Sequence, residues 1–476
     1  MDRKSYLELW FQSLHKYHDF LCVQILTNAL EVRSMPKVVK KLNDFVSLID
    51  PSENQILNMS VEEAEQIVAS GDREKIGEIE GSFAIVTKDG QQVTMARSIG
   101  RPMRYFMAKQ VQGPLLIVAE RIDEIYEYLK SLDLHHQFNP VYTRMVPAHY
   151  VVKLNVVGCP DPNPDYNRYY VPSEKKLPAD LDKIGEAYVG AMTNECQKWL
   201  EQIPKNEPIG VLFSGGIDSG SVFLVLYHTL LQMGQSPSRL KAFTLNINNG
   251  PDADQAHEFL NQLDLSVFHE VLEGGLSDLD FRETIRVIED YKQRDVEAAT
   301  MVLALCKKIR EQYPDWKCLI DGDGGDENLR SYPIEENPEL TIRSVLNNHL
   351  LYHEGWGVDK IKHSLTYSGG QSRGHVRTFA PAKAHGFKAF SPYSLPNVID
   401  VAERIPFIDL TDWDHEKLYQ LKGEVVKRGV KAITGMDMPV FPKRRMQHGT
   451  VSMDDFKKVF ADSELEYRQY FASLYM

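Results

Sequence analysis

The first residues that could do chemistry lie in a glycine-rich loop between an apolar segment, residues 209–213, and a helical segment, residues 218–233. Adjacent glycines let the backbone approach an anion closely, and free N–H groups at a helix start attract phosphate. Serine hydroxyls can donate to phosphate oxygens, whereas an aspartate repels phosphate unless Mg²⁺ lies between them. The residues that we expect to hold pyrophosphate and its metal are Ser214, Gly215, Gly216, Asp218 and Ser219.

This loop lacks the lysine of the G-x-x-x-x-G-K-[ST] phosphate loop, so nothing in it indicates transfer of the γ-phosphate of ATP. It matches the SGGxDS loop of ATP pyrophosphatases, which cleave ATP between its α and β phosphates. The alternative is a Ser/Gly turn that only starts a helix. A second motif favours the ATP interpretation.

The second motif is the acidic run DGDGGDE over residues 321–327, which follows an apolar segment, residues 317–320. Its spacing does not fit a Ca²⁺ loop, because Gly325 precedes Asp326 and no glutamate follows at loop position twelve. A solvated turn is the alternative to a metal-binding role.

Strand and helix signals alternate through this half of the chain, which predicts a parallel sheet with right-handed crossovers. The expected strands are residues 209–213, 241–247, 266–271 and 317–320, and the expected helices are residues 218–233, 252–263 and 296–312. Ligands bind beyond the carboxyl ends of such strands, so both loops should meet at one edge of the sheet. Past about residue 335 the pattern is mainly helical, with candidates at residues 350–365, 396–405 and 417–434.

The N-terminal half reads as β-rich, since short alternating segments are separated by turn signals. These segments are residues 82–87, 92–96, 115–119 and 150–154. Pro, Asp, Asn and Lys crowd together over residues 158–178, which predicts a linker between a domain of residues 1–165 and a domain of residues 180–476.

The composition argues against several classes of protein. The formal charge of -13 disfavours a protein whose main task is to grip nucleic acid. The five cysteines form no CxxC pair, and no segment approaches the ~20 apolar residues of a membrane span. We therefore expect a cytoplasmic protein with no membrane and no nucleic-acid partner.

Together, the SGGIDS and GDGGDE loops behind a β-rich half closely resemble the synthetase domain of asparagine synthetases and β-lactam synthetases, over nearly the whole chain. The resemblance implies ATP and Mg²⁺ as cofactors, with Asp218 and Asp326 holding the metal. It places Asp323 near the attacking amine, whose proton a carboxylate can accept. It also implies nucleotide contacts from Leu245, on the adenosine-binding strand, and from Gly322.

Residues 441–449 resemble the basic loop that supplies a lysine to the adenylate-forming site, and Lys443 is the expected residue. A fixed cation there can stabilise charge on the adenylate and on the tetrahedral intermediate. Arg444, Arg445 and a solvated basic turn are the alternatives. The family segment G-x-E-x-R-x-P-F has lost its glutamate and arginine in residues 386–406, which argues against aspartate as the acid.

Residues 81–86 and 95–106 resemble the class II glutamine amidotransferase domain, so the N-terminal half should have the layered αββα fold of Ntn-type glutaminases. Such enzymes need a cysteine at position one of the mature chain, whereas position two here is Asp2 and Cys22 lies in an apolar run. Glutamine hydrolysis is not expected.

The sequence thus predicts an AMP-forming carbon–nitrogen ligase that joins small-molecule carboxylate and amine substrates, in the manner of β-lactam synthetases. Ammonia-dependent amidation, delivery of the adenylate to sulfur or a tRNA base, and a nucleotide-binding pseudoenzyme are the alternatives. A homodimer is a family-level expectation only.

Overall fold

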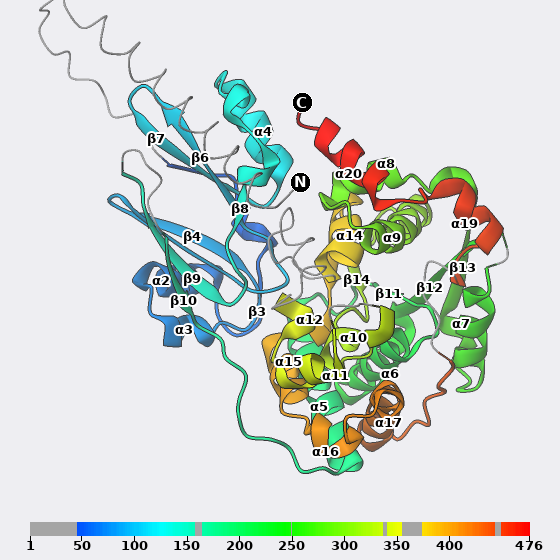
Figure 1. Ribbon diagram of the computed structural model, residues 1–476. Coiled ribbons are helices and arrows are strands. Elements are labelled where there is room, and N and C mark those ends of the chain that lie inside the picture. The colour runs from blue at the N-terminus through cyan, green and yellow to red at the C-terminus, as the bar shows by residue number, and fades with distance from the viewer. Residues whose placement is uncertain (1–44, 158–163, 249, 337–339, 355–373, 443–448) are drawn as a thin grey trace, which may run out of the picture. The chain divides into compact units, whose positions relative to one another are not determined.

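The structure, a computed structural model, describes residues 45–157, 164–248, 250–336, 340–354, 374–442 and 449–476 (Figure 1). All of them belong to one unit, Asn43–Met476, so the predicted boundary between residues 165 and 180 stays a prediction. None of the described helices combines the length and apolar character that crossing a bilayer requires.

A parallel five-stranded sheet forms the centre of the C-terminal part, as predicted. The strand order is β13-β12-β11-β14-β15, and every neighbouring pair is parallel. The strands are β11 (Ile209–Leu212), β12 (Leu240–Ile247), β13 (His269–Gly274), β14 (Cys318–Ile320) and β15 (Lys388–Phe390).

The sheet differs from the prediction in two details. The strand expected at residues 266–271 begins at His269, because Ser266–Phe268 form a 3-10 turn first. The region past residue 335, expected to be mainly helical, also contributes a strand, β15, which pairs with β14 from Cys318↔Lys388 to Ile320↔Phe390.

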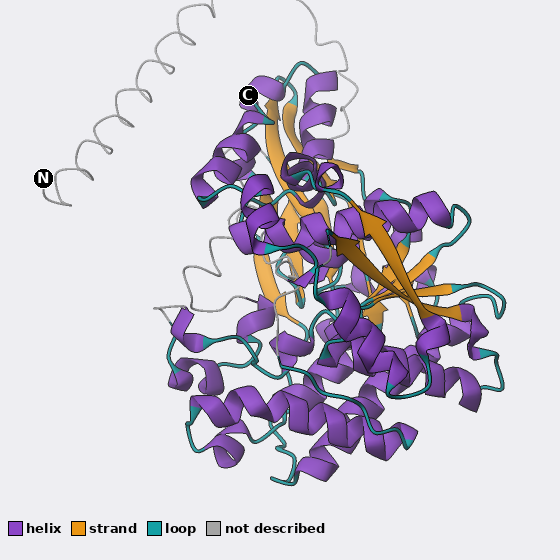
Figure 2. Cartoon of the chain, turned by 90° about the vertical axis from the view of Figure 1, so that its right-hand side faces the viewer, coloured by secondary structure: helices purple, strands orange, loops and turns teal. Residues whose placement is uncertain are grey.

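Helices cover both faces of this sheet (Figure 2). Alternate residues of a strand point to opposite faces, so apolar side chains on each face pack against helices. Ile209 and Val211 pack with α5 (Leu181–Gln202), α6 (Ile217–Gln232), α7 (Asp252–Asn261) and α17 (His415–Thr434). Leu212 and Leu319 pack on the other face with α9 (Gln293–Gln312) and α14 (Ala380–Ala384). The predicted α/β fold class is confirmed.

Helix α17 lies unusually close to α5, since glycines meet where the two helices cross. A Cβ on Gly429 would stand 2.2 Å from the carbonyl oxygen of Gly185, and a Cβ on Gly185 would stand 2.6 Å from that of Val425. Asp414 caps the start of α17 by accepting from Lys417 N, and Gly435, with φ +75°, ends it. This crossing fixes the face of α17 that points toward the site.

The remaining helices of this part lie around the sheet or extend toward the C-terminus. They are α8 (Phe281–Ile288), α10 (Gly325–Asn328), α11 (Ile342–Asn347), α12 (Leu351–Glu354), a π-helical turn η8 (His375–Phe379), α15 (Pro396–Glu403), α16 (Phe407–Thr411), α19 (Met453–Val459) and α20 (Glu464–Ser473). Of the helix expected at residues 350–365, only α12 falls within the described residues.

The N-terminal part has two four-stranded sheets, ordered β1-β7-β6-β8 and β10-β9-β5-β4. The strands are β1 (Phe45–Ser47), β4 (Ala84–Asp89), β5 (Gln92–Arg97), β6 (Arg104–Gln110), β7 (Gly113–Ala119), β8 (Arg144–Met145), β9 (Tyr150–Asn155) and β10 (Asp165–Arg168), with β2 (Gln55–Ile56) and β3 (Gly81–Ser82) as a separate pair. Strand β10 lies inside the predicted linker and pairs antiparallel with β9.

Apolar side chains from both sheets form a shared core between them, for example Met95 and Val118. Helices α2 (Val61–Ser70) and α3 (Arg73–Gly77) pack on the outer face of one sheet, and α4 (Ile122–Ser131) packs on the other. The order of layers is therefore αββα, as expected.

Candidate functional site

The first loop joins β11 to α6 at the carboxyl edge of the parallel sheet. Gly215 has φ +67°, where only glycine is unstrained, and a Cβ on it would stand 2.8 Å from the backbone of Ala256. The hydroxyls of Ser214 and Ser219 lie 3.3 Å apart, and Ser219 Oγ accepts from Ser214 N at 3.2 Å. Gly216 caps α6, so the free N–H groups of that helix start at the loop.

The second loop follows β14 and lies directly against the first. A Cβ on Gly322 would stand 2.7 Å from Ser219 N, and a Cβ on Gly325 would stand 2.2 Å from Asp218 Oδ1. Neither glycine is required by a positive φ; both are required by the closeness of the other loop. The structure therefore brings the two predicted motifs together into one site.

Lys422 of α17 connects the two aspartates that the sequence predicts as metal ligands. Its Nζ donates to Asp218 Oδ2 and, at 2.5 Å, to Asp326 Oδ1. The lysine side chain is 5% exposed, whereas each carboxylate is 23% exposed. Burial alone would lower the pKa of Lys422, but the charges of Asp218 and Asp326 raise it above its ordinary value.

Sequence reasoning missed Lys422, although a signal was present. The buried positions of α17 form one apolar stripe that includes Leu418, Leu421 and Val425, and Lys422 falls on it. A lysine on the buried face of a helix is rarely left without a paired anion. This pattern alone would have predicted that Lys422 pairs with acidic side chains in the core.

The chemistry of these donors fits Mg²⁺ bound to a nucleotide. Mg²⁺ usually keeps several waters and is held by one or two carboxylates together with substrate phosphates. Asp218 and Asp326 supply two carboxylates beside the glycine-rich loop that the sequence predicts to bind phosphate. Among the described residues, no three His, Cys, Asp or Glu side chains gather into a metal-binding group.

Asp321 and Asp323 form the base of the second loop. Asp321 is buried and accepts from Ser391 Oγ at 2.7 Å and from Asp323 N at 2.9 Å. Burial raises the pKa of Asp321 to about 6, although these hydrogen bonds oppose the shift. Burial and the neighbouring charge of Asp321 raise the pKa of Asp323 well above its ordinary value. Asp323 is thus a stronger proton acceptor than an exposed aspartate.

The π-helical turn η8 orients Asp323 from the opposite side. Thr378 Oγ1 lies 2.7 Å from Asp323 Oδ2 and 2.8 Å from the carbonyl oxygen of Gly374. The adjacent Arg377 is paired with Asp295 of α9, with Arg377 Nε 2.8 Å from Asp295 Oδ1. Sequence reasoning identified neither Thr378 nor Arg377, because both lie in a region read only as helical.

Strand β12 extends past its neighbour at the same edge of the sheet. The β11–β12 ladder ends at Leu212↔Phe243, so residues 244–247 continue beyond it. The side chain of Leu245 is 4% exposed and packs in the core. Any nucleotide contact from this position would therefore come from its backbone.

Two other sequence features lie at this edge. Gln255 of α7 donates from Nε2 to the carbonyl oxygen of Ser214 at 3.2 Å. Thr450, just after the predicted basic loop, accepts from Ile247 N at 3.0 Å. Lys443 itself lies outside the described residues, as do Arg444 and Arg445.

Part of the chain that holds this site resembles known proteins. Residues 201–414 match the sequence model of the asparagine synthase family. These residues are similar to an asparagine synthase domain, and they make up a little under half of the chain. Both motif loops and η8 fall inside this domain, whereas Lys422 lies just after it.

The curated relatives resemble only part of the chain. Asparagine synthetase B [glutamine-hydrolyzing] of Escherichia coli K12 is 27% identical over 195 residues, which cover 35% of this chain and 34% of the relative. Asparagine synthetase [glutamine-hydrolyzing] of Asparagus officinalis is 25% identical over 248 residues, covering 51% and 37%. The chain thus matches little more than a third of the length of each relative.

Among solved structures, an NMN synthetase from Francisella tularensis is 12% identical with a TM-score of 0.23, covering 56% of this chain and 99% of that one. So low a score carries no argument. The fold of the asparagine synthase domain is instead established by its own sheet order.

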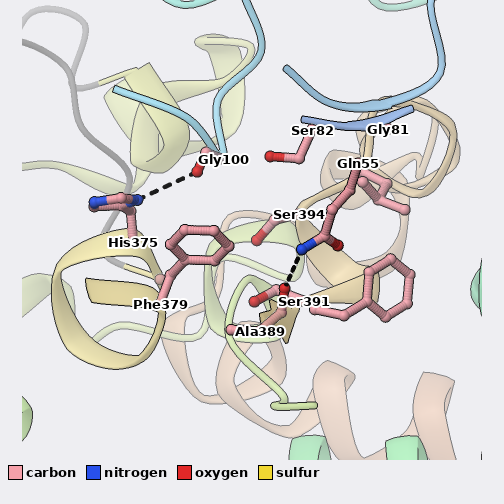
Figure 3. Close-up of a pocket in the computed structure, with 12 residues that line it drawn as sticks. Gln55, Gly81, Ser82, Gly100, His375, Phe379, Ala389, Ser391 and Ser394 are labelled. Carbon is pink, nitrogen blue, oxygen red and sulfur yellow. Dashed lines mark hydrogen bonds between the residues drawn. The ribbon is translucent and has the colours of Figure 1, made fainter. Parts of the chain in front are cut away.

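A small cavity lies behind the second loop of the asparagine synthase domain (Figure 3). Its volume is about 30 Å³, enough for a water molecule or two but not for a substrate. Ser391 and Ser394 line it, and Figure 3 shows the hydrogen bond of His375 to Gly100 and that of Gln55 to Ala389 across it. Two of its lining residues support the acidic loop, since Ser391 Oγ donates to Asp321 and Ser394 Oγ donates to the carbonyl oxygen of Asp323.

Proposed function

We propose that this chain uses ATP and Mg²⁺ to convert a carboxylate into an acyl-adenylate and joins the acyl group to an amine, releasing AMP and pyrophosphate. The coarser assignment, an ATP-dependent ligase, follows from the asparagine synthase domain and its relatives. One observation carries the finer proposal: Asp218 and Asp326, from two loops distant in sequence, converge on a single point.

The first loop would bind the leaving pyrophosphate. The N-terminus of a helix, two serine hydroxyls and a glycine backbone form an anion-binding surface that lacks a γ-phosphate lysine. When bound, Mg²⁺ would neutralise the charge that develops on the β and γ phosphates as they leave. Asp218 and Asp326 would hold that metal against the loop.

Adenylation breaks the bond between the α and β phosphates. An oxygen of the carboxylate substrate attacks the α-phosphorus, and pyrophosphate departs. Lys443 is the residue that the family resemblance proposes for stabilising the charge on the adenylate. The end of its loop is held near the carboxyl end of β12 by Thr450 and Ile247, which supports this proposal.

Amide formation would use Asp323 as the proton acceptor. The amine attacks the acyl carbon, AMP leaves, and the proton of the amine passes to the carboxylate. A base with a raised pKa suits this transfer, because catalysis is most efficient when the pKa lies near the operating pH. Thr378 would hold the carboxylate in the required orientation.

For the amine we propose an organic amine, either in a second molecule or in the acid itself as in β-lactam synthetases. Ammonia is the alternative that the family offers. The altered segment at residues 386–406 favours an acid other than aspartate. Within this segment, Ser391 donates to Asp321 and stabilises the acidic loop.

The test is to follow pyrophosphate and AMP release with ATP, Mg²⁺ and a panel of amino acids and β-amino acid derivatives, with and without ammonia or glutamine. We expect release with particular acids, its loss in Asp218→Asn, and its retention in Asp315→Asn, where the aspartate is exposed. Failure of wild-type protein to bind a Mg²⁺ complex of α,β-methylene-ATP would overturn the proposal without requiring the correct acid.

A further inference from the structure

The position of Lys422 has a consequence beyond the proposed reaction. Its ammonium group contacts both carboxylates that would hold Mg²⁺, at Asp218 Oδ2 and Asp326 Oδ1. The side chain is nearly enclosed, and α17 cannot easily shift because it meets α5 at Gly429 and Gly185. The ammonium group of Lys422 therefore lies between the two loops as a fixed positive charge.

Two carboxylates forced together need a positive charge nearby, because like charges in a poorly solvated site repel strongly. Gly325 brings the second loop directly against Asp218, so the two carboxylates lie on closely packed loops. A metal ion and the ammonium of Lys422 would use the same oxygen atoms. Each would therefore weaken the binding of the other.

We infer that Lys422 is the internal counter-ion of the Asp218–Asp326 pair and excludes a divalent cation from it until phosphate groups arrive with the metal. The inference rests on the proposed role of this pair as metal ligands. Phosphate oxygens would give the ammonium a new anionic partner, so Lys422 could release a carboxylate without being left unpaired. Metal and nucleotide would then enter the site as one unit, and metal alone would bind poorly.

The test is a titration of Mn²⁺ alone, followed by electron paramagnetic resonance, on wild-type protein, Lys422→Met and Lys422→Met/Asp326→Asn. The positive charge of Lys422 would lie about 4 Å from a bound Mn²⁺. At an effective dielectric of about 20, removing that charge would change the Mn²⁺ dissociation constant by far more than a factor of ten. We expect Lys422→Met to bind Mn²⁺ at least about ten-fold more tightly than wild type, even after solvent screening. Asp326→Asn should remove this gain.

The inference is overturned if wild type binds Mn²⁺ as tightly as Lys422→Met, or if the gain survives Asp326→Asn. Thermal unfolding covers the case in which Lys422→Met is unstable. Mn²⁺ should then raise the melting temperature of Lys422→Met but not of wild type or of Lys422→Arg, which keeps the positive charge. Equal shifts in all three proteins would also contradict it.

A separate experiment distinguishes failure of this inference from failure of the proposed function. Mn²⁺ with α,β-methylene-ATP is added to wild-type protein. No nucleotide binding would contradict the ligase proposal, while the titration with metal alone would still decide the role of Lys422.

Discussion

Gly325 lies so close to Asp218 that a Cβ on the glycine would stand 2.2 Å from Asp218 Oδ1. This contact joins the acidic loop to the glycine-rich loop and fixes the distance between the two proposed metal ligands. A side chain at this position would collide with Asp218, so the two motifs can lie this close only with glycine here.

Gly325→Ala should therefore impair catalysis more than stability. The added methyl must displace the Asp218 carboxylate, which Lys422 also holds, and a misplacement of about 1 Å can cost about 100-fold in rate. We expect kcat/KM for pyrophosphate release to fall by about that factor. Steady-state kinetics with the acid found in the panel would measure it.

Gly190→Ala in α5 is the matched control for that experiment. Its Cβ would lie 3.6 Å from Ile433 Cδ1, an ordinary contact, and alanine favours a helix over glycine by about 1 kcal/mol. Its activity should stay at the wild-type level. Similar losses in both variants would show that the contact between the loops is unimportant.

Asp323→Asn should separate the two half-reactions. The amide cannot accept the proton of the amine, so amide formation should slow by about 100- to 10,000-fold. Acid-dependent exchange of labelled pyrophosphate into ATP should persist, because adenylation does not use this carboxylate. Parallel loss of exchange and product would contradict the role given to Asp323.

Thr378→Val should move the pH dependence of amide formation. The hydroxyl of Thr378 lowers the pKa of Asp323, so its removal should raise that pKa further. Since the carboxylate must be ionised to accept a proton, the acidic limb of the kcat/KM profile should shift to higher pH. A shift to lower pH, or none, would argue against Asp323 as the base.

Glu403 holds the segment after the acidic loop, and its pKa predicts how stability depends on pH. It pairs with Arg330 at 2.9 Å, and both side chains are 5% exposed. Burial alone would raise the pKa of Glu403, but His349 and Arg330 lower it to about 2 from an ordinary value of 4.5. Because the folded state has the lower pKa, this stabilisation is complete above pH 4.5 and is lost as pH falls toward 2.

Glu403→Gln should accordingly lower the free energy of unfolding by about 3 kcal/mol at pH 7, and by progressively less toward acid. Urea denaturation at several pH values would measure the difference. Glu424→Gln, which removes an exposed ion pair with Arg428, should change the free energy of unfolding little at any pH, because solvent screens exposed pairs. A deficit in Glu403→Gln that does not change with pH would refute the assignment.

Much of the fold could be predicted because its signals are local. Apolar strands leading into the loops at Ser214 and Asp321, within an alternation of strand and helix signals, predicted the parallel sheet and the edge where the loops meet. Strand β15 could not be predicted in this way, since its three residues, Lys388–Phe390, form a strand only by pairing with β14.

The site was also predicted incompletely, because some of its contacts form only through tertiary packing. Lys422 is 204 residues from Asp218 and 96 from Asp326 in the sequence, so its pairing depends on how α17 packs. Thr378 likewise meets Asp323 only through the tertiary fold. Asp218, Asp326 and Asp323 could be predicted as candidates because each lies in a motif with a recognisable spacing.

The central claim, an acyl-adenylate intermediate, is tested most directly with an acid labelled with ¹⁸O in its carboxylate. If the carboxylate oxygen attacks the α-phosphorus of ATP, the AMP released in each turnover carries one labelled oxygen, and mass spectrometry will detect it. Labelled inorganic phosphate together with ADP would instead show attack at the γ-phosphorus, and unlabelled AMP would show hydrolysis without activation of the acid. Either result would contradict the account.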